Sequence, residues 1–261
     1  MKPPSLIGMV HLLPLPGSPA FAGDMNLVLD RAATDATILA EAGFGGLMVE
    51  NFGDAPFFPD DVPAVTVAAI TAAVTAVQAA VLIPVGVNVL RNDALAALGV
   101  AAVTGASYIR VNVLTGTMFT DQGVLNGRAA EVARDRQRLC PGTGILADVF
   151  VKHAAPPPGV TIEQSGADTW ERGGADALIV SGVETGAEPD LDLARRLRVA
   201  LPEATILIGS GATTTNLSRL ANVANGAIVG SSLKQGGRPS QPVDFARAAA
   251  LVEAASAIGW V

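Results

Sequence analysis

The stretch PVGVNVLRNDALAALGVAAVTGASYIRVNV, residues 84–113, decides the fold because it contains one complete repeat of a larger pattern. It begins and ends with a short apolar run of the kind that forms a strand buried on both faces. A helix-like segment from Asp93 joins the two runs, and two parallel strands connected through a helix make a βαβ unit. The stretch therefore predicts a parallel sheet covered by helices.

Short apolar runs of this kind recur along the whole chain, with helix-like segments between them. They lie at residues 6–10, 46–49, 84–89, 108–113, 145–151, 177–180, 206–208 and 227–229. This order predicts an α/β protein with a single (β/α)8 fold, the TIM barrel. The chain has 261 residues, a usual size for one such barrel, and no linker divides it. We therefore expect residues 1–261 to form one TIM-barrel domain.

The composition limits the kinds of partner. The net charge is -7 and no basic run is present, which argues against nucleic acid and against a polybasic membrane patch. Residues 62–90 carry no charge over a length that can span a bilayer, but prolines and threonines interrupt them, so we interpret them as a barrel helix and a strand. The single cysteine, Cys140, and the lack of a visible signal peptide indicate a cytoplasmic protein without a transmembrane segment.

Polar residues stand at the C-terminal ends of the predicted strands, where TIM barrels carry their active sites. In YIRVNV, residues 108–113, Arg110 and Asn112 share one face because strand residues alternate. A buried Arg110 needs a carboxylate, and Glu50 and Asp148 are the candidates. We expect the following side chains to be catalytic: Asp148, Arg110, Glu50, His11, Asn112, Asn88, Lys152 and His153. The alternative is an ion-pair network that only stabilises the barrel.

Several of these residues suit particular chemistry. His11 and His153, the two histidines of the chain, are each either a general acid or base near neutral pH or an ordinary loop residue. Lys152 is a candidate for a Schiff base in an aldolase-type site. The histidines with Glu50 and Asp148 could also hold a divalent metal, but no HxH or HxxxH spacing supports this. We therefore assign no metal ligand and identify no cofactor.

The last three predicted strands each end with glycine beside serine. Glycine lets the backbone approach an anion, serine adds a hydroxyl donor, and TIM barrels often bind phosphate at the ends of strands 7 and 8. Lys234 can add a charge if it points inward. The expected phosphate-binding residues are Ser181, Gly182, Ser210, Gly211, Gly230, Ser231, Ser232 and Lys234. The alternative is ordinary turn chemistry, which uses the same residue types.

Two long segments after predicted strands are candidate lids. Residues 51–63 form a structured loop that contains Asn51, Asp54 and three phenylalanines, which either cover a site or partner surface or pack the loop down. Residues 114–127 form a second long loop. It contains the further candidate lid residues Thr120, Asp121 and Gln122.

Long motifs spread over most of the chain are similar to those of a known family. They are GMVHLLPLPGSP (8–19), VENFGDAPF (49–57), RVNVLTGTMFTDQG (110–123), ADVFVKHA (147–154), VSGVETG (180–186), GSGAT (209–213) and VGSSLK (229–234). Together they resemble the BtpA/SgcQ family. The positions that match its motifs are His11, Glu50, Asn51, Asp54, Arg110, Asn112, Thr120, Asp121, Gln122, Asp148, Lys152 and His153.

The resemblance implies a TIM barrel similar to phosphate-binding enzymes. One branch of the family is named for a role in building photosystem I, and the other resembles proteins encoded beside sugar-uptake and sugar-metabolism systems. Two functions follow as expectations. The first is an enzyme acting on a phosphorylated sugar or nucleoside-like small molecule, as an isomerase, lyase or transferase. The second is a non-catalytic biogenesis or stability factor for a membrane complex. A homo-oligomer is compatible with either.

Overall fold

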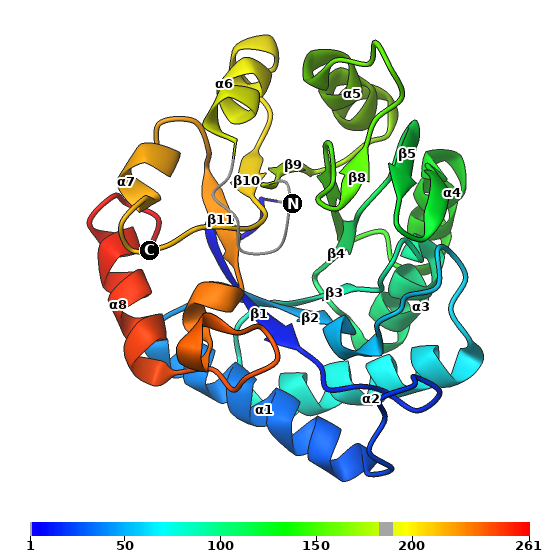
Figure 1. Ribbon diagram of the computed structural model, residues 1–261, viewed down its shortest axis with the longest axis vertical. Helices are drawn as coiled ribbons and strands as arrows, with labels where there is room; N and C mark the ends of the chain where they lie inside the picture. Colours follow the sequence, from blue (N-terminus) through cyan, green and yellow to red (C-terminus); the bar gives the residue numbers. More distant parts are fainter. Residues whose placement is uncertain (1, 183–189) are drawn as a thin grey trace.

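The computed structural model describes residues 2–182 and 190–261. Within them, parallel strands close into a barrel in the order β1-β11-β10-β9-β7-β4-β3-β2 (Figure 1). The barrel strands are β1 (Leu6–His11), β2 (Gly46–Glu50), β3 (Val85–Asn88), β4 (Tyr108–Val111), β7 (Gly144–Asp148), β9 (Ala177–Val180), β10 (Ile206–Ile208) and β11 (Gly226–Val229). Each coincides with one of the apolar runs, and the predicted (β/α)8 barrel is confirmed. Part of the VSGVETG motif, residues 183–186, lies outside the described residues.

Helices surround the barrel, as Figure 1 shows. They are α1 (Met25–Ala42), α2 (Ala64–Ala80), α3 (Ala94–Thr104), α4 (Ala129–Leu139), α5 (Ile162–Ala167), α6 (Leu191–Ala200), α7 (Leu217–Leu220) and α8 (Phe245–Ser256). The uncharged segment 62–90 contains α2 and β3, as we interpreted it. No helix in the described part of the chain has the length and apolar character needed to cross a membrane.

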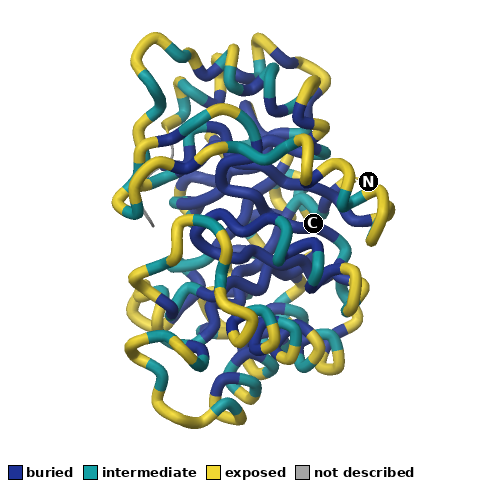
Figure 2. The backbone as a smooth tube through the Cα atoms, turned by 90° about the vertical axis from the view of Figure 1, so that its right-hand side faces the viewer, coloured by how far each residue is buried: buried dark blue, intermediate teal, exposed yellow. Residues whose placement is uncertain are grey.

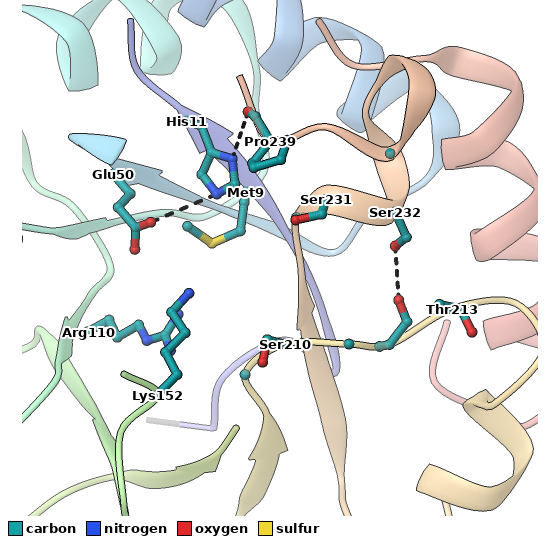
Figure 3. A pocket seen from close by; sticks show the side chains of 15 residues that line it. Met9, His11, Glu50, Arg110, Lys152, Ser210, Thr213, Ser231, Ser232 and Pro239 are labelled. Atoms are coloured by element: carbon teal, nitrogen blue, oxygen red, sulfur yellow. Dashed lines mark hydrogen bonds and ion pairs between the residues drawn. The ribbon is translucent and has the colours of Figure 1, made fainter. Parts of the chain in front are cut away.

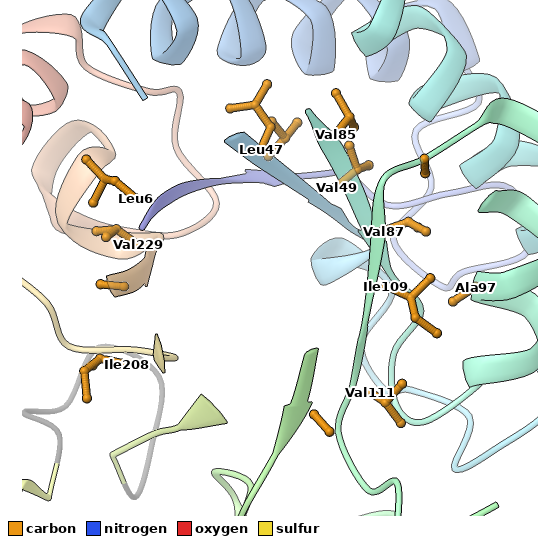
Figure 4. Close-up of a cluster of buried hydrophobic side chains, with 14 of the residues drawn as sticks. Leu6, Leu47, Val49, Val85, Val87, Ala97, Ile109, Val111, Ile208 and Val229 are labelled. Carbon is orange, nitrogen blue, oxygen red and sulfur yellow. The ribbon is translucent and has the colours of Figure 1, made fainter. Parts of the chain in front are cut away.

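The apolar side chains form two layers, because successive strand residues point to opposite sides. Leu47 and Val49 of β2 belong to the outer layer, which Figure 4 shows pointing from the strands toward the helices. Met48, between them, belongs to the inner layer with Met9 and Tyr108. Figure 2 shows the buried strands at the centre and the exposed turns at the outside. The apolar inner layer fills the barrel and leaves the polar residues at the C-terminal strand ends.

The segment 114–127, expected to be a loop, contains a β-hairpin of β5 (Thr117–Thr120) and β6 (Gly123–Asn126). The short strand β8 (Ala154–Ala155) adds to its other side. The expectation of a loop is wrong because Met118 and Leu125 alternate with polar residues and pack in a small apolar cluster of their own. The hairpin therefore holds residues 120–123 in a turn.

Candidate active site

The parallel register brings the polar strand ends side by side at the mouth of the barrel. Glu50 is in register with His11 on one side and with Asn88 on the other, and Asn88 is in register with Arg110. Each of these four side chains is at least nine-tenths buried. In-register residues of neighbouring parallel strands point the same way, so these residues form one polar row across four strands.

Asp148 of β7 holds the guanidinium of Arg110. Arg110 Nε and Nη2 each donate to one carboxylate oxygen at 2.8 Å. Burial alone would lower the pKa of Arg110, but the charge and the hydrogen bonds of Asp148 raise it. Asn112 Nδ2 and Ser181 Oγ each donate to the same carboxylate at 3.2 Å. Asp148, and not Glu50, is therefore the close partner of Arg110, and each of its oxygens accepts two hydrogen bonds.

His11 is a neutral imidazole with a defined orientation. Burial lowers its pKa well below the usual 6.5, and the positive charges of Lys234 and Lys152 lower it further. Its Nδ1 lies 3.2 Å from the carbonyl oxygen of Pro239, which can only accept, so Nδ1 carries the proton. The unprotonated Nε2 then faces Glu50 Oε1 at 3.8 Å. This pair is not an ion pair but two proton acceptors that face each other.

Two further groups complete the charged half of the mouth. Asn88 Nδ2 donates to Glu50 Oε2 at 2.6 Å, which leaves the other oxygen toward His11. The side chain of Lys152 extends into the cavity between Glu50 and Arg110 (Figure 3). Burial lowers the pKa of Lys152 and outweighs the charge of Glu50, which raises it, while the charge of Arg110 adds to the lowering. The mouth therefore contains an amine, an imidazole and a carboxylate beside a fixed guanidinium.

A cavity of about 420 Å³ lies between these residues and the opposite wall of the mouth (Figure 3). Its lining includes Met9, His11, Glu50, Arg110, Lys152, Gly209, Ser210, Gly211, Ala212, Thr213, Gly230, Ser231, Ser232, Gly237 and Pro239. The wall opposite the charged row consists largely of small residues that follow β10 and β11. The cavity is large enough for a small organic molecule of the size of a phosphorylated sugar.

The small residues of this wall allow close backbone approach. A Cβ at Gly209 would lie 2.4 Å from Ile179 Cγ2 and 2.5 Å from Ser181 Oγ, so only glycine fits there. Ser232 Oγ donates to the carbonyl oxygen of Ala212 at 2.9 Å and joins the two loops. Because Ser231 begins a short helical turn, its amide has no partner within that turn.

Lys234 does not reach this wall, and the expectation that it points inward is wrong. Its side chain is fully buried, and Nζ lies 2.8 Å from Asp35 Oδ2 of α1. Asp35 Oδ1 also accepts from the amide of Val243 at 2.8 Å. The sequence analysis overlooked Asp35, and only its polar character on a helix face toward the barrel could have indicated it. Lys234 therefore fixes the segment after β11 against α1.

Other expected site residues lie behind the cavity wall. Asn88, Asn112, Asp148 and Ser181 are all buried. Asn88 and Asp148 bind the lining residues Glu50 and Arg110, and Asn112 and Ser181 bind Asp148. The amide of Gly182 donates to Ser210 Oγ at 3.3 Å. These residues orient the lining rather than form part of it.

A second cavity of about 230 Å³ shares Glu50 and Lys152 with the first. His153, Asp121 and Gln122 line it, whereas Thr120 donates to the carbonyl oxygen of Gly123 inside the hairpin turn. Arg91 lines it too, although the sequence analysis did not select this residue. Its position three residues after the strand-end Asn88 is the signal that was missed.

Asn51 and Asp54 fasten the segment 51–63 instead of covering the mouth. Asp54 accepts from the amide of Leu15 at 2.8 Å and from Asn51 Nδ2 at 3.1 Å. Asn51 Oδ1 accepts from the amide of Leu90 at 2.7 Å. Phe52, between them, stacks on the His11 ring with centroids 4.5 Å apart. The aromatic segment thus contacts the mouth through Phe52.

The arrangement of possible metal ligands among the described side chains does not favour a metal site. In residues 2–182 and 190–261, no three histidine, cysteine, aspartate or glutamate side chains are grouped to hold a metal ion. Both oxygens of Asp148 accept hydrogen bonds from neighbours that include Arg110, which leaves Glu50 beside His11 as the nearest pair.

Comparisons with known proteins establish the family. The family model described as BtpA family matches residues 2–257. The chain is 47% identical over 252 residues to the photosystem I biogenesis protein BtpA of Synechocystis sp., covering 95% of this chain and 87% of that protein. It is 31% identical over 257 residues to the putative sgc region protein SgcQ of Escherichia coli, covering 95% and 93%.

Solved structures are similar in fold. The structure of Mycobacterium tuberculosis tryptophan synthase overlays with a TM-score of 0.63 at 18% identity, covering 99% of this chain and 93% of that chain. This likeness concerns the fold alone. The family model and the sequence relatives, which span nearly the whole chain, lead to one conclusion: the chain belongs to the BtpA family.

Proposed function

We propose that this protein is an enzyme that acts on a phosphorylated sugar or nucleoside-like small molecule. One observation carries the proposal: a single cavity has a neutral histidine beside a carboxylate on one side and a glycine- and serine-rich wall on the other. The first is an arrangement for proton transfer, and the second is an arrangement for binding an anion. A scaffold protein has no need to bury such groups around a cavity.

The anionic group of the substrate binds the wall formed by the segments after β10 and β11. The backbone amides of Ser231 and Ser232, at the start of the turn, and the hydroxyl groups of Ser210 and Thr213 supply hydrogen bonds. Arg110, on the opposite side, supplies positive charge that offsets the net charge of the ligand. The anion fixes one end of the substrate so that its reacting carbons lie near His11.

Proton transfer belongs to His11 and Glu50. The unprotonated Nε2 of His11 accepts a proton from the substrate, and Glu50 shares it across 3.8 Å. Arg110 polarises a substrate oxygen as charge develops on it. We assign Asp148 a positioning role, because its four hydrogen bonds leave it poorly placed to act as a base. This chemistry serves an isomerase, a lyase or a transferase.

Thermal unfolding with inorganic phosphate and a panel of sugar phosphates tests the proposal. At about a hundredfold excess over Kd, a specific ligand raises the Tm of a chain of this size by about 5–10 °C. Ser231→Asp places a negative charge on the wall and removes the shift. Ser218→Asp, with the same change on the exposed face of α7, is the matched control and keeps it. Equal shifts in both variants, or no shift with any phosphate, contradict the proposal.

The second candidate is a non-catalytic role in assembling a membrane complex. The 47% identity to a protein named for photosystem I biogenesis favours it. The two candidates differ in what the cavity is for. The test replaces the histidine equivalent to His11 with asparagine in the relative from Synechocystis sp. and measures the level of photosystem I. The level stays unchanged if the barrel is only a scaffold, and it falls if the chemistry of the cavity is needed.

A further inference from the structure

The chain uses lysine sparingly, and its three lysines have three different environments. Of the seventeen basic residues, only Lys2, Lys152 and Lys234 are lysines. Lys2 is exposed. Lys234 is buried and paired with Asp35 at 2.8 Å. Lys152 is the one whose side chain enters the cavity (Figure 3).

The Lys152 amine is not held in an ion pair by residues 2–182 or 190–261. Across the described residues, no carboxylate lies within ion-pair distance of Nζ, although Glu50 lines the same cavity. The carboxylate of Asp148 is paired with Arg110. Burial lowers the pKa of Lys152 and outweighs the charge of Glu50, which raises it, while the guanidinium groups of Arg110 and Arg91 add to the lowering. The amine therefore loses its proton more readily than that of an exposed lysine.

The backbone of Lys152 is fixed so that the amine is presented to the cavity. Arg91 Nη2 donates to the carbonyl oxygen of Lys152 at 2.5 Å, and Arg91 itself is 4% exposed. The neighbouring Val151 is buried in the apolar cluster under the hairpin. An arginine at this position could bind an anion as well as a lysine, but it could not lose its proton. The presence of lysine is therefore informative in a chain that uses arginine almost everywhere else.

We propose that Lys152 is a catalytic nucleophile that forms an imine with a carbonyl carbon of the substrate. The substrate class is then an aldehyde or ketone that carries an anionic group. The anionic part rests on the proposed function, whereas the imine rests on the position and surroundings of Lys152 alone.

The step balances without a further reactant. The neutral amine attacks the carbonyl carbon, the C–N bond forms as the C=O π bond breaks, and one of the two amine protons passes through His11 Nε2 to the oxygen, which becomes a hydroxyl group. The second proton leaves the nitrogen by the same route and reaches the hydroxyl group, the C–O bond breaks, and water leaves as the C=N bond forms. Amine and carbonyl thus give imine and water, and hydrolysis returns both. Glu50, whose Oε1 lies 3.8 Å from His11 Nε2, relays protons between His11 and the oxygen of the substrate.

The first experiment measures the reactivity of each lysine with a small carbonyl compound. The whole protein is treated with limiting formaldehyde and cyanoborohydride at neutral pH, and peptide mass mapping quantifies methylation at all three lysines. Lys152 reacts several-fold faster than Lys2, because only a neutral amine forms an imine. A rate at Lys152 equal to or below that at Lys2 overturns the proposal.

The second experiment separates the imine from the anion site. Glycolaldehyde phosphate and glycolaldehyde are compared, each with borohydride to reduce the imine to a stable amine. We expect the phosphorylated aldehyde to label Lys152 nearly stoichiometrically and the other aldehyde to label it several-fold less. Lys152→Arg removes the nucleophilic amine and loses the label, whereas the matched control Lys2→Arg retains the label on Lys152. The melting temperatures of both variants verify that they fold.

The outcomes distinguish the two proposals. Equal labelling of Lys152 by both aldehydes supports the imine and contradicts the anion site. A phosphate-induced rise in Tm without labelling of Lys152 supports the anion site and overturns the imine. Labelling confined to Lys2 and the amino terminus also overturns the imine.

Discussion

Two buried ion pairs connect distant parts of this barrel, and they differ in what they leave accessible. Lys234 and Asp35 join the segment after β11 to α1, and both side chains are enclosed. Arg110 and Asp148 join β4 to β7 with the same short distance, but Arg110 also lines the cavity. A buried pair is thus a functional candidate only where one partner still reaches a ligand. The first pair stabilises the fold, whereas the second holds a positive charge in position.

The largest effect is expected from breaking the enclosed pair. Lys234→Met removes the nearer cation of the buried Asp35 carboxylate and leaves only Arg31, at 3.2 Å, as its ion-pair partner. We expect a loss of about 3 kcal/mol of unfolding free energy, the lower end of the range for breaking a buried pair, and a Tm lowered by about 10 °C. The phosphate-induced shift remains, because neither Lys234 nor Asp35 lines the cavity. Thermal and denaturant unfolding measure both effects.

The double variant Asp35→Leu with Lys234→Met is the control. Removing both charges together costs less than removing Lys234 alone, because no buried carboxylate remains and the partly exposed Arg31, which also contacts Asp35, can turn to solvent. A double variant as unstable as Lys234→Met would show that shape, not charge, sets the stability of this contact.

Asp148→Asn is expected to have an intermediate effect on stability and a larger one on binding. The amide group turns a donor toward Arg110, so we expect a loss of about 2–3 kcal/mol of unfolding free energy, in the range for an unsatisfied buried polar group. The released guanidinium also weakens the phosphate-induced Tm shift, which Lys234→Met does not. If ligand affinity per folded molecule stays at the wild-type value, Arg110 does not bind the ligand.

The smallest effect concerns pH. Burial lowers the pKa of His11 below 6.5 in the folded protein, so below that pH the unfolded chain takes up a proton that the folded chain does not. The unfolding free energy therefore falls as the pH decreases below about 6.5, by at most about 1.4 kcal/mol per pH unit for one proton. His11→Asn removes this contribution, and urea unfolding from pH 7 to pH 5 compares the two proteins. Identical pH slopes would contradict the neutral His11.

The strand ends could be predicted because they depend on local patterns. Alternation placed Arg110 and Asn112 on one face, and the structure has both bound to Asp148. The hairpin of β5 and β6 was missed because its short alternating segments, with Met118 and Leu125 inward, are interrupted by turn residues. Local composition favoured a loop there, and packing against β8 and the cluster around Val151 decided otherwise.

The sequence by itself determined the barrel, the end that carries the polar residues and the need of Arg110 for a carboxylate. All of these follow from a period of two along a strand and from the cost of burying an unpaired charge. Only the tertiary structure decided between Glu50 and Asp148, because that choice depends on the register of neighbouring strands. Only the tertiary structure decided that Lys234 points away from the cavity, because its partner Asp35 lies 199 residues earlier in the chain. Contacts at such separations form when the barrel closes, and no local pattern encodes them.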